Sequence, residues 1–188
     1  MSQSAKIELF KEATIKFNKN HNLISRKNTD KIIDEAIEEA TALTKHLNQY
    51  KNILDIGTGS GLPGIPLAIF NENKNIYLSE KNNKKNYHLK KTIKLLEIEN
   101  ATTIGSVNKN TKINKKVDCV VTKAFASTKK TIDIANSFLE KPFTLMLLKG
   151  KLKTIYKEIA EANISKENYE IIKIENKKEK HILKIQNE

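Results

Sequence analysis

The sequence predicts an α/β fold in which a mostly parallel sheet follows two N-terminal helices and closes with an antiparallel hairpin. From residue 51 on, β-branched runs alternate with helical segments, a pattern typical of parallel strands joined by helices. The last two strand-like runs are separated only by residues 176–180, a connection that suits a hairpin and is too short for a parallel crossover. The first fifty residues show helical spacing instead.

The N-terminal part has its own helical signal. Apolar residues recur every three or four positions from Ile7 to Phe17, and they do so again from Ile33 to Leu47. Thr29 and Asp30 precede the second run and are expected to cap it. Two amphipathic helices are therefore predicted within residues 1–50.

The remaining elements alternate between strand and helix. β-branched runs predict strands at 52–56, 76–80, 101–105, 117–122, 143–148, 169–175 and 181–186. Apolar residues at helical spacing predict helices at 62–70, 82–97, 128–139 and 153–162. We divide the chain into an N-terminal helical extension, 1–50, and a main domain, 51–188, which together form one compact unit.

Composition places the chain among globular proteins. Hydrophobic residues make up 38% and charged residues 30% of the 188 positions, which is too apolar for disorder and too interrupted by charge for a membrane span. No apolar leader opens the sequence and Cys119 is its single cysteine, so we expect a cytoplasmic protein without disulfides and without membrane association. The four histidines lack ligand spacing, and no metal site is expected.

The charge balance favours an anionic partner. Thirty-four Lys and Arg residues face 22 Asp and Glu residues, which gives a formal net charge of +12. A surplus of this size attracts nucleic acid or another anionic surface. The sequence does not determine the oligomeric state, and a monomer is the expectation.

A glycine-rich segment follows the first expected strand. Four of the six glycines lie between Gly57 and Gly64, where they let the backbone turn tightly and approach a ligand. No Gly-Lys-Ser/Thr follows, which excludes a Walker loop. The run does satisfy G-x-G-x-x-G, and Glu80 ends the next strand, so a dinucleotide site stays open. Asp55, which opens a D-x-G-x-G-x-G series, and the closing hairpin favour S-adenosylmethionine instead.

The predicted topology indicates which residues would contact S-adenosylmethionine. The methionine part would lie at the end of the first strand, the ribose near Glu80, and the adenine near the loop after the third strand. The predicted cofactor residues are Asp55, Gly57, Gly59, Leu62, Glu80, Asn108, Lys109 and Lys123. Lys123 ends the fourth expected strand, where donor and acceptor should meet, and it is the candidate catalytic residue.

Several motifs together resemble one protein family. Gly-Leu-Pro-Gly-Ile-Pro stands at 61–66, Lys-Ala-Phe-Ala-Ser at 123–127, Leu-Lys-Gly at 148–150, Asn-Lys at 18–19 and Asn-Leu-Ile-Ser at 22–25. The chain thereby resembles the small-subunit ribosomal RNA methyltransferase G family, also called glucose-inhibited division protein B. The resemblance implies a class I S-adenosylmethionine-dependent methyltransferase, with a Rossmann-like sheet in the main domain.

The same resemblance implies a substrate. It points to methyl transfer onto N7 of a guanosine in 16S ribosomal RNA, taken as free RNA or within a 30S assembly intermediate. Guanine N7 exposes a lone pair at neutral pH, so no general base is needed, and alignment of the two ligands can supply about 7 kcal/mol or more. We expect RNA contacts at Asn22, Ser25, Lys84, Lys85 and Lys149.

Two alternative functions stay open at this stage. The family's Arg-His-x-x-Asp-Ser is replaced by Glu-Ala-Ile-Glu-Glu-Ala at 35–40, and Lys123 stands where Arg is usual. These departures, with a further one at Lys109, motivate an RNA-binding protein with a methyltransferase fold and weak or lost catalysis. The G-x-G-x-x-G run keeps an NAD-dependent oxidoreductase as the other alternative. The lysine-rich helix 82–97 suits either RNA-phosphate contact or a solvated helix face.

Overall fold

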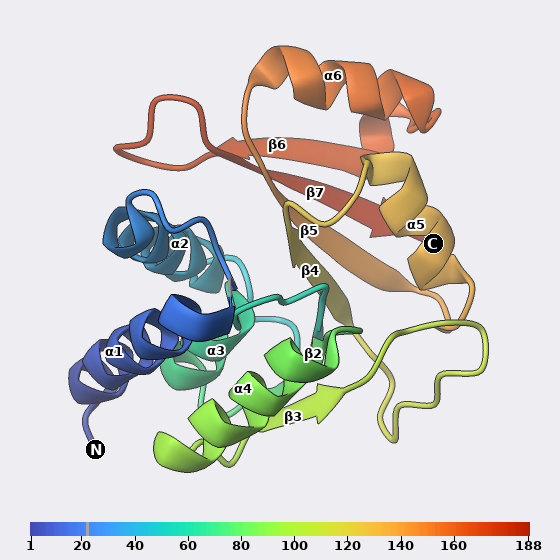
Figure 1. Cartoon of the computed structure of the whole chain (residues 1–188). Coiled ribbons are helices and arrows are strands. Elements are labelled where there is room, and N and C mark those ends of the chain that lie inside the picture. Colours follow the sequence, from blue (N-terminus) through green and yellow to red (C-terminus); the bar gives the residue numbers. More distant parts are fainter. Residues whose placement is uncertain (22) are drawn as a thin grey trace.

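The computed structural model describes residues 1–21 and 23–188, with helices on both faces of a single sheet (Figure 1). The helices are α1 (Gln3–His21), α2 (Thr29–Thr44), α3 (Gly64–Phe70), α4 (Asn83–Leu95), α5 (Thr128–Asn136), α6 (Leu152–Glu161) and the 3₁₀ helix η1 (Lys166–Asn168). The strands are β1 (Asn52–Ile56), β2 (Asn75–Ser79), β3 (Ala101–Ile104), β4 (Cys119–Lys123), β5 (Phe143–Lys149), β6 (Tyr169–Lys173) and β7 (His181–Asn187).

The strands form one sheet in the order β3-β2-β1-β4-β5-β7-β6. β1 to β5 run parallel, while β7 pairs antiparallel with both β5 and β6. The strand order reverses between β1 and β4, and open α/β sheets bind ligands at the carboxyl ends of strands beside such a reversal. The topology therefore predicts a ligand site at the loops that follow β1 and β4.

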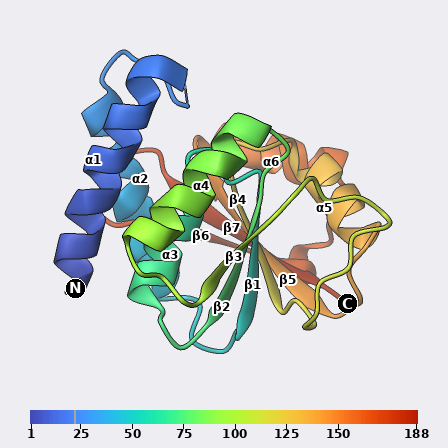
Figure 2. The same ribbon diagram turned by 60° about the horizontal axis from the view of Figure 1, so that its bottom comes forward.

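Each face of the sheet has its own apolar core, because successive strand residues point to opposite sides. On one face, Phe10 of α1 and Leu43 of α2 pack in the same cluster as Ile53 of β1. On the other, Ile155 of α6 packs in a cluster with Leu54. Figures 1 and 2 show the division, with α1 to α4 on one side and α5 and α6 on the other. Burial of each such side chain contributes on the order of 1.5 to 3 kcal/mol.

The predicted mostly parallel sheet with its closing hairpin is confirmed, but the predicted helix cap is wrong. The residue before α2 is Asn28, which has a φ of 60° and makes no side-chain cap bond. The Thr29 hydroxyl donates to the carbonyl oxygens of Ser25 and Arg26, at 3.1 and 3.3 Å, instead of accepting a helix N–H. Asp30 lies within the first turn. The sequence also did not predict η1, because three residues are too few to show a period.

The division of the chain at residue 50 stays a prediction. The apolar residues of α1 and α2 belong to the same core cluster as those of α3 and β1. The two helices therefore depend on the sheet for their burial. Among the described residues, no helix is both long and apolar enough to cross a membrane.

Candidate active site

The loop after β1 brings the backbone close to the segment that follows β4. Gly57 has a φ of +73°, which side-chain-bearing residues rarely adopt. A Cβ at this position would lie 2.3 Å from the Cδ2 atom of Phe125, so the aromatic ring packs directly on the glycine backbone. Phe125 keeps 36% of its surface exposed. The glycine loop and the segment after β4 thus form one continuous surface.

Two carboxylates that the sequence singled out anchor this loop. Asp55 is buried in β1, and its Oδ2 atom accepts a hydrogen bond from the Gly64 N–H at 2.9 Å. Glu80 follows β2, and its Oε2 atom accepts from the Gly59 N–H at 3.1 Å. The Oε1 atom of Glu80 accepts from the Asn82 N–H at 2.7 Å. The structure therefore brings both acids to the loop, and their contact with a cofactor stays a prediction.

The loop has features that fit S-adenosylmethionine. The Glu80 carboxylate offers acceptor oxygens to ribose hydroxyls at the end of β2. A Cβ at Gly59 would meet only the Gly57 carbonyl oxygen, at 3.9 Å, so there is room for a ligand beside the loop. Burial raises the pKa of Asp55 to about 7, and the Glu80 carboxylate adds to the effect. A cationic ligand group nearby would favour the ionised form of Asp55.

The other predicted cofactor residues lie on two different loops. Leu62 is in the glycine loop and is 8% exposed. Asn108 and Lys109 are exposed in the segment after β3. The Asn108 N–H donates to Thr111 Oγ1, and its side-chain oxygen accepts from the Asn110 N–H, both at 2.8 Å. In the described part of the chain these hydrogen bonds stay within a local turn, and an adenine contact there remains a prediction.

Lys123 ends β4, and its ammonium pairs with a carboxylate that the sequence reasoning missed. Its Nζ atom lies 2.7 Å from Oε2 of Glu39 in α2, and Nζ of Lys180 lies 2.6 Å from Oε1 of the same residue. The Glu39 side chain is 2% exposed. Burial raises the pKa of Glu39, but the two ammonium groups outweigh it and hold the pKa below its ordinary value. The family's Arg-His-x-x-Asp-Ser motif could have pointed to this residue, because the Asp of that motif aligns with Glu39.

Lys149 ends β5, and its ammonium pairs with another carboxylate that the sequence did not predict. Its Nζ atom lies 2.6 Å from Oε2 of Glu158 in α6. The same oxygen accepts from the backbone N–H and the hydroxyl of Thr128, at 3.0 and 2.5 Å. Burial raises the pKa of Glu158, but Lys149 and Thr128 outweigh this and lower it below its ordinary value. Helical periodicity gave no indication that Glu158 reaches the end of β5.

Both ion pairs line a cavity of about 280 Å³. Its lining includes Glu39 with Lys123, Lys149 with Glu158, and Phe125. Since Phe125 also packs on the glycine loop, the cavity adjoins the predicted cofactor site. We call it the acceptor cavity.

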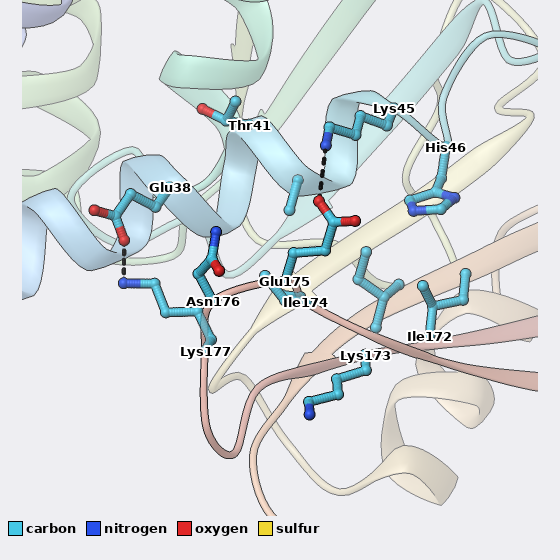
Figure 3. A pocket seen from close by; sticks show the side chains of 12 residues that line it. Glu38, Thr41, Lys45, His46, Ile172, Lys173, Ile174, Glu175, Asn176 and Lys177 are labelled. Atoms are coloured by element: carbon cyan, nitrogen blue, oxygen red, sulfur yellow. Dashed lines mark hydrogen bonds and ion pairs between the residues drawn. The ribbon is translucent and has the colours of Figure 1, made fainter.

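A larger cavity, of about 630 Å³, lies between α2 and the β6–β7 hairpin (Figure 3). Figure 3 shows two ion pairs across it, Lys45 with Glu175 at 3.4 Å and Lys177 with Glu38. Its described lining contains none of the predicted site residues. These contacts hold the hairpin on α2 and so place Lys180 beside Glu39.

The predicted RNA contacts are spread over several elements. Lys84 and Lys85 lie in the first turn of α4, where their backbone N–H groups donate to the side-chain oxygen of Asn82, at 3.0 and 3.1 Å. Ser25 is exposed between α1 and α2. Asn22 lies outside the described residues. Contact of these residues with RNA stays a prediction.

Solved structures establish the class of the fold. TYW2 of M. jannaschii, crystallised with AdoMet, aligns with a TM-score of 0.57 and 22% identity over 80% of this chain and 74% of its own. PigF with SAH aligns with a TM-score of 0.61 and 12% identity over 82% and 56%. With the glycine loop between β1 and α3, these likenesses define a class I S-adenosylmethionine-dependent methyltransferase fold.

The family follows from the sequence comparisons. The model for rRNA small subunit methyltransferase G matches residues 3–184, so the chain belongs to this family. Ribosomal RNA small subunit methyltransferase G of Brachyspira hyodysenteriae is 35% identical over 97% of this chain and 90% of its own length. The protein of that name from Glaesserella parasuis is 32% identical over 85% and 76%. The resemblance seen in the motifs is thereby confirmed.

Proposed function

We propose that this chain transfers a methyl group from S-adenosylmethionine to N7 of a guanosine in 16S ribosomal RNA. The observation that carries the proposal is the family match over residues 3–184, with a relative of the same name similar over nearly the whole chain. The acceptor cavity supports it, because it lies at the carboxyl ends of β4 and β5 and adjoins the glycine loop. Ligands of such sheets bind at this edge.

Methyl transfer to guanine N7 requires the protein to align the two ligands and does not require it to transfer a proton. Bound S-adenosylmethionine supplies a methyl group on a positively charged sulfur, and guanine N7 accepts it without losing a proton. The residues of this chain then have to orient two ligands and exclude water between them. Lys123 and Lys149 each pair with a carboxylate, and their ammonium groups can donate hydrogen bonds that orient a ligand.

The proposed substrate is 16S RNA, either free or within a 30S assembly intermediate, and the proposed location is the cytoplasm. The net charge of +12 supports attraction to RNA. Lys84 and Lys85 lie in the first turn of α4, just beyond the carboxyl end of β2. The glycine loop lies at the same end of the parallel strands. They are suited to contact phosphates of an RNA that enters from this edge.

The two alternatives have less support. An RNA-binding protein without efficient catalysis is not favoured, because the chain matches a methyltransferase family over almost its entire length. An NAD-dependent oxidoreductase has the G-x-G-x-x-G run and the position of Glu80 in its favour, and both are equally features of the S-adenosylmethionine site described above.

The proposal is tested by labelled methyl transfer to 30S subunits and deproteinised 16S RNA from cells that lack this gene, followed by mapping of N7-methylguanosine. We expect Lys123→Ala to slow single-turnover transfer by up to about a hundredfold, because misplacement by about 1 Å costs this much. Lys123→Arg should keep or raise the rate, since Arg retains the charge and adds a second parallel donor. Lys157→Ala, which removes the exposed partner of Glu161 on α6, is the matched control. Cofactor binding without any labelled RNA would leave the RNA-binding alternative.

A further inference from the structure

The ion pair at the end of β5 has hydrogen-bonding capacity that the fold does not use. All three contacts of Glu158 converge on its Oε2 atom. Within residues 1–21 and 23–188, no group donates a hydrogen bond to Oε1. The side chains of Lys149 and Glu158 line the acceptor cavity and remain 14% and 18% exposed. The pair thus offers the cavity one ammonium donor beside one carboxylate acceptor.

This order of groups complements one edge of guanine. On its Watson–Crick edge guanine presents the O6 acceptor, then the N1–H donor, then the N2 amino donor. We propose that Lys149 donates to O6 while the free oxygen of Glu158 accepts from N1–H and the N2 amino group of the target guanosine. This inference rests on the function proposed above and names the residues that select its base.

The same pair would reject adenine. Adenine places an amino group where guanine has O6, and an acceptor nitrogen where guanine has N1–H. The ammonium would then face a donor and the carboxylate would face an acceptor, and unpaired buried polar groups discriminate strongly between ligands. Selection of guanine follows from the charges of two neighbouring side chains.

The arrangement also leaves N7 free to react. N7 lies on the imidazole side of the purine, away from N1 and the N2 amino group, so an edge held by Glu158 does not cover it. Phe125 lines the same cavity and packs on Gly57 of the glycine loop. A base stacked on this ring would lie between the ion pair and the cofactor loop, in the manner of flipped bases that enzymes read by one edge and an aromatic face.

Glu158 is better suited to this role than the other carboxylate of the cavity. Glu39 is 2% exposed and lies between Lys123 and Lys180, with a lysine ammonium close to each of its oxygens. Among the residues that the structure describes, Glu158 pairs with a single lysine, and its side chain has a larger exposed fraction. We therefore assign the reading of the base to the Lys149–Glu158 pair and a structural role to Glu39.

The test compares guanosine and inosine 5′-monophosphates, which differ only by the N2 amino group. We expect the wild-type protein to bind the guanosine nucleotide about tenfold more tightly, because a charge-assisted hydrogen bond is lost with inosine. Glu158→Gln should bring the ratio toward one and lower kcat/KM for 16S RNA about tenfold, with unchanged S-adenosylmethionine affinity. Lys149→Met should weaken the binding of both nucleotides. Glu161→Gln, on the outer side of α6, is the control.

The outcomes separate the inference from the proposed function. If Glu158→Gln keeps the wild-type nucleotide ratio, or if wild type shows no binding preference, the pair does not read the base. Labelled 16S RNA in that case would leave the proposed function intact. If wild type selects the guanosine nucleotide but labels no RNA, the proposed function fails while the reading pair stands. A lower melting temperature with an unchanged ratio would mean that Glu158 only caps α5, and the inference would be wrong.

Discussion

Replacement of Glu39 by Gln should destabilise the protein much more than the same replacement of its neighbour Glu38. Loss of one partner from a buried ion pair costs about 3 to 5 kcal/mol when the other charge stays buried. Here the partners Lys123 and Lys180 are 21% and 38% exposed and can be rehydrated, so we expect about 1 to 3 kcal/mol. Glu38 is 59% exposed and pairs with Lys177, so its loss should cost no more than about 1 kcal/mol.

The dependence on pH provides a second check on the same residue. The folded-state pKa of Glu39 lies below its ordinary value of 4.5, so the unfolded chain takes up the proton first as the pH falls. The stability that Glu39 contributes is therefore present above about pH 4.5 and is lost as the pH falls through the lowered pKa.

Urea unfolding of wild type and both variants at neutral and acidic pH measures the effect. The gap between wild type and Glu39→Gln should be full at neutral pH and should close in acid. Equal losses for the Glu38 and Glu39 variants at neutral pH would refute the reasoning. A difference in the free energy of unfolding between wild type and Glu39→Gln that persists at a pH below the lowered pKa of Glu39 would also refute it.

Three further predictions concern the ligand sites. Gly57→Ala should lower stability by about 1 to 2 kcal/mol or more and abolish cofactor binding, because its φ is +73° and the new Cβ would lie 2.3 Å from an aromatic carbon; Gly105→Ala, with nothing within 4 Å, is the control in thermal unfolding. Glu80→Ala should weaken S-adenosylmethionine binding in calorimetry by about 1 to 3 kcal/mol, and unchanged affinity would remove Glu80 from the site. Joint replacement of Lys84 and Lys85 by Ala should reduce the salt dependence of RNA binding by about 0.7 log units per lost single-strand contact. An unaltered slope would identify them as solvated lysines.

The sequence predicted the fold well because its signals are local. Alternating β-branched runs and helical spacing located the strands, and the short connection at 176–180 predicted the antiparallel pair that the sheet contains. The cap of α2 failed for a physical reason. The Thr29 hydroxyl can donate to carbonyl oxygens as well as accept from an N–H, and the sequence does not say which it will do.

The candidate site could be predicted only where the topology itself places a residue. Asp55 and Glu80 sit at the ends of adjacent strands, so strand order alone brings them to the glycine loop. Glu39 and Glu158 are helix residues whose partners are distant in the chain or on another element. Nothing in helical periodicity specifies such contacts, because they depend on how each helix packs across the sheet.

The two halves of the candidate site differ in how far apart in the chain their parts lie. The glycine loop and Glu80 come from the consecutive units β1, α3 and β2, whereas the acceptor cavity needs α2 and the β6–β7 hairpin, joined through Glu39 and Lys180. Parts of a fold can open as cooperative units while the rest of the structure stays folded. Release of the hairpin would therefore dismantle the acceptor cavity while the cofactor loop stays intact. Amide exchange would be faster in β6 than in β1, and under the proposed function binding of the target base would be lost before binding of the methyl donor.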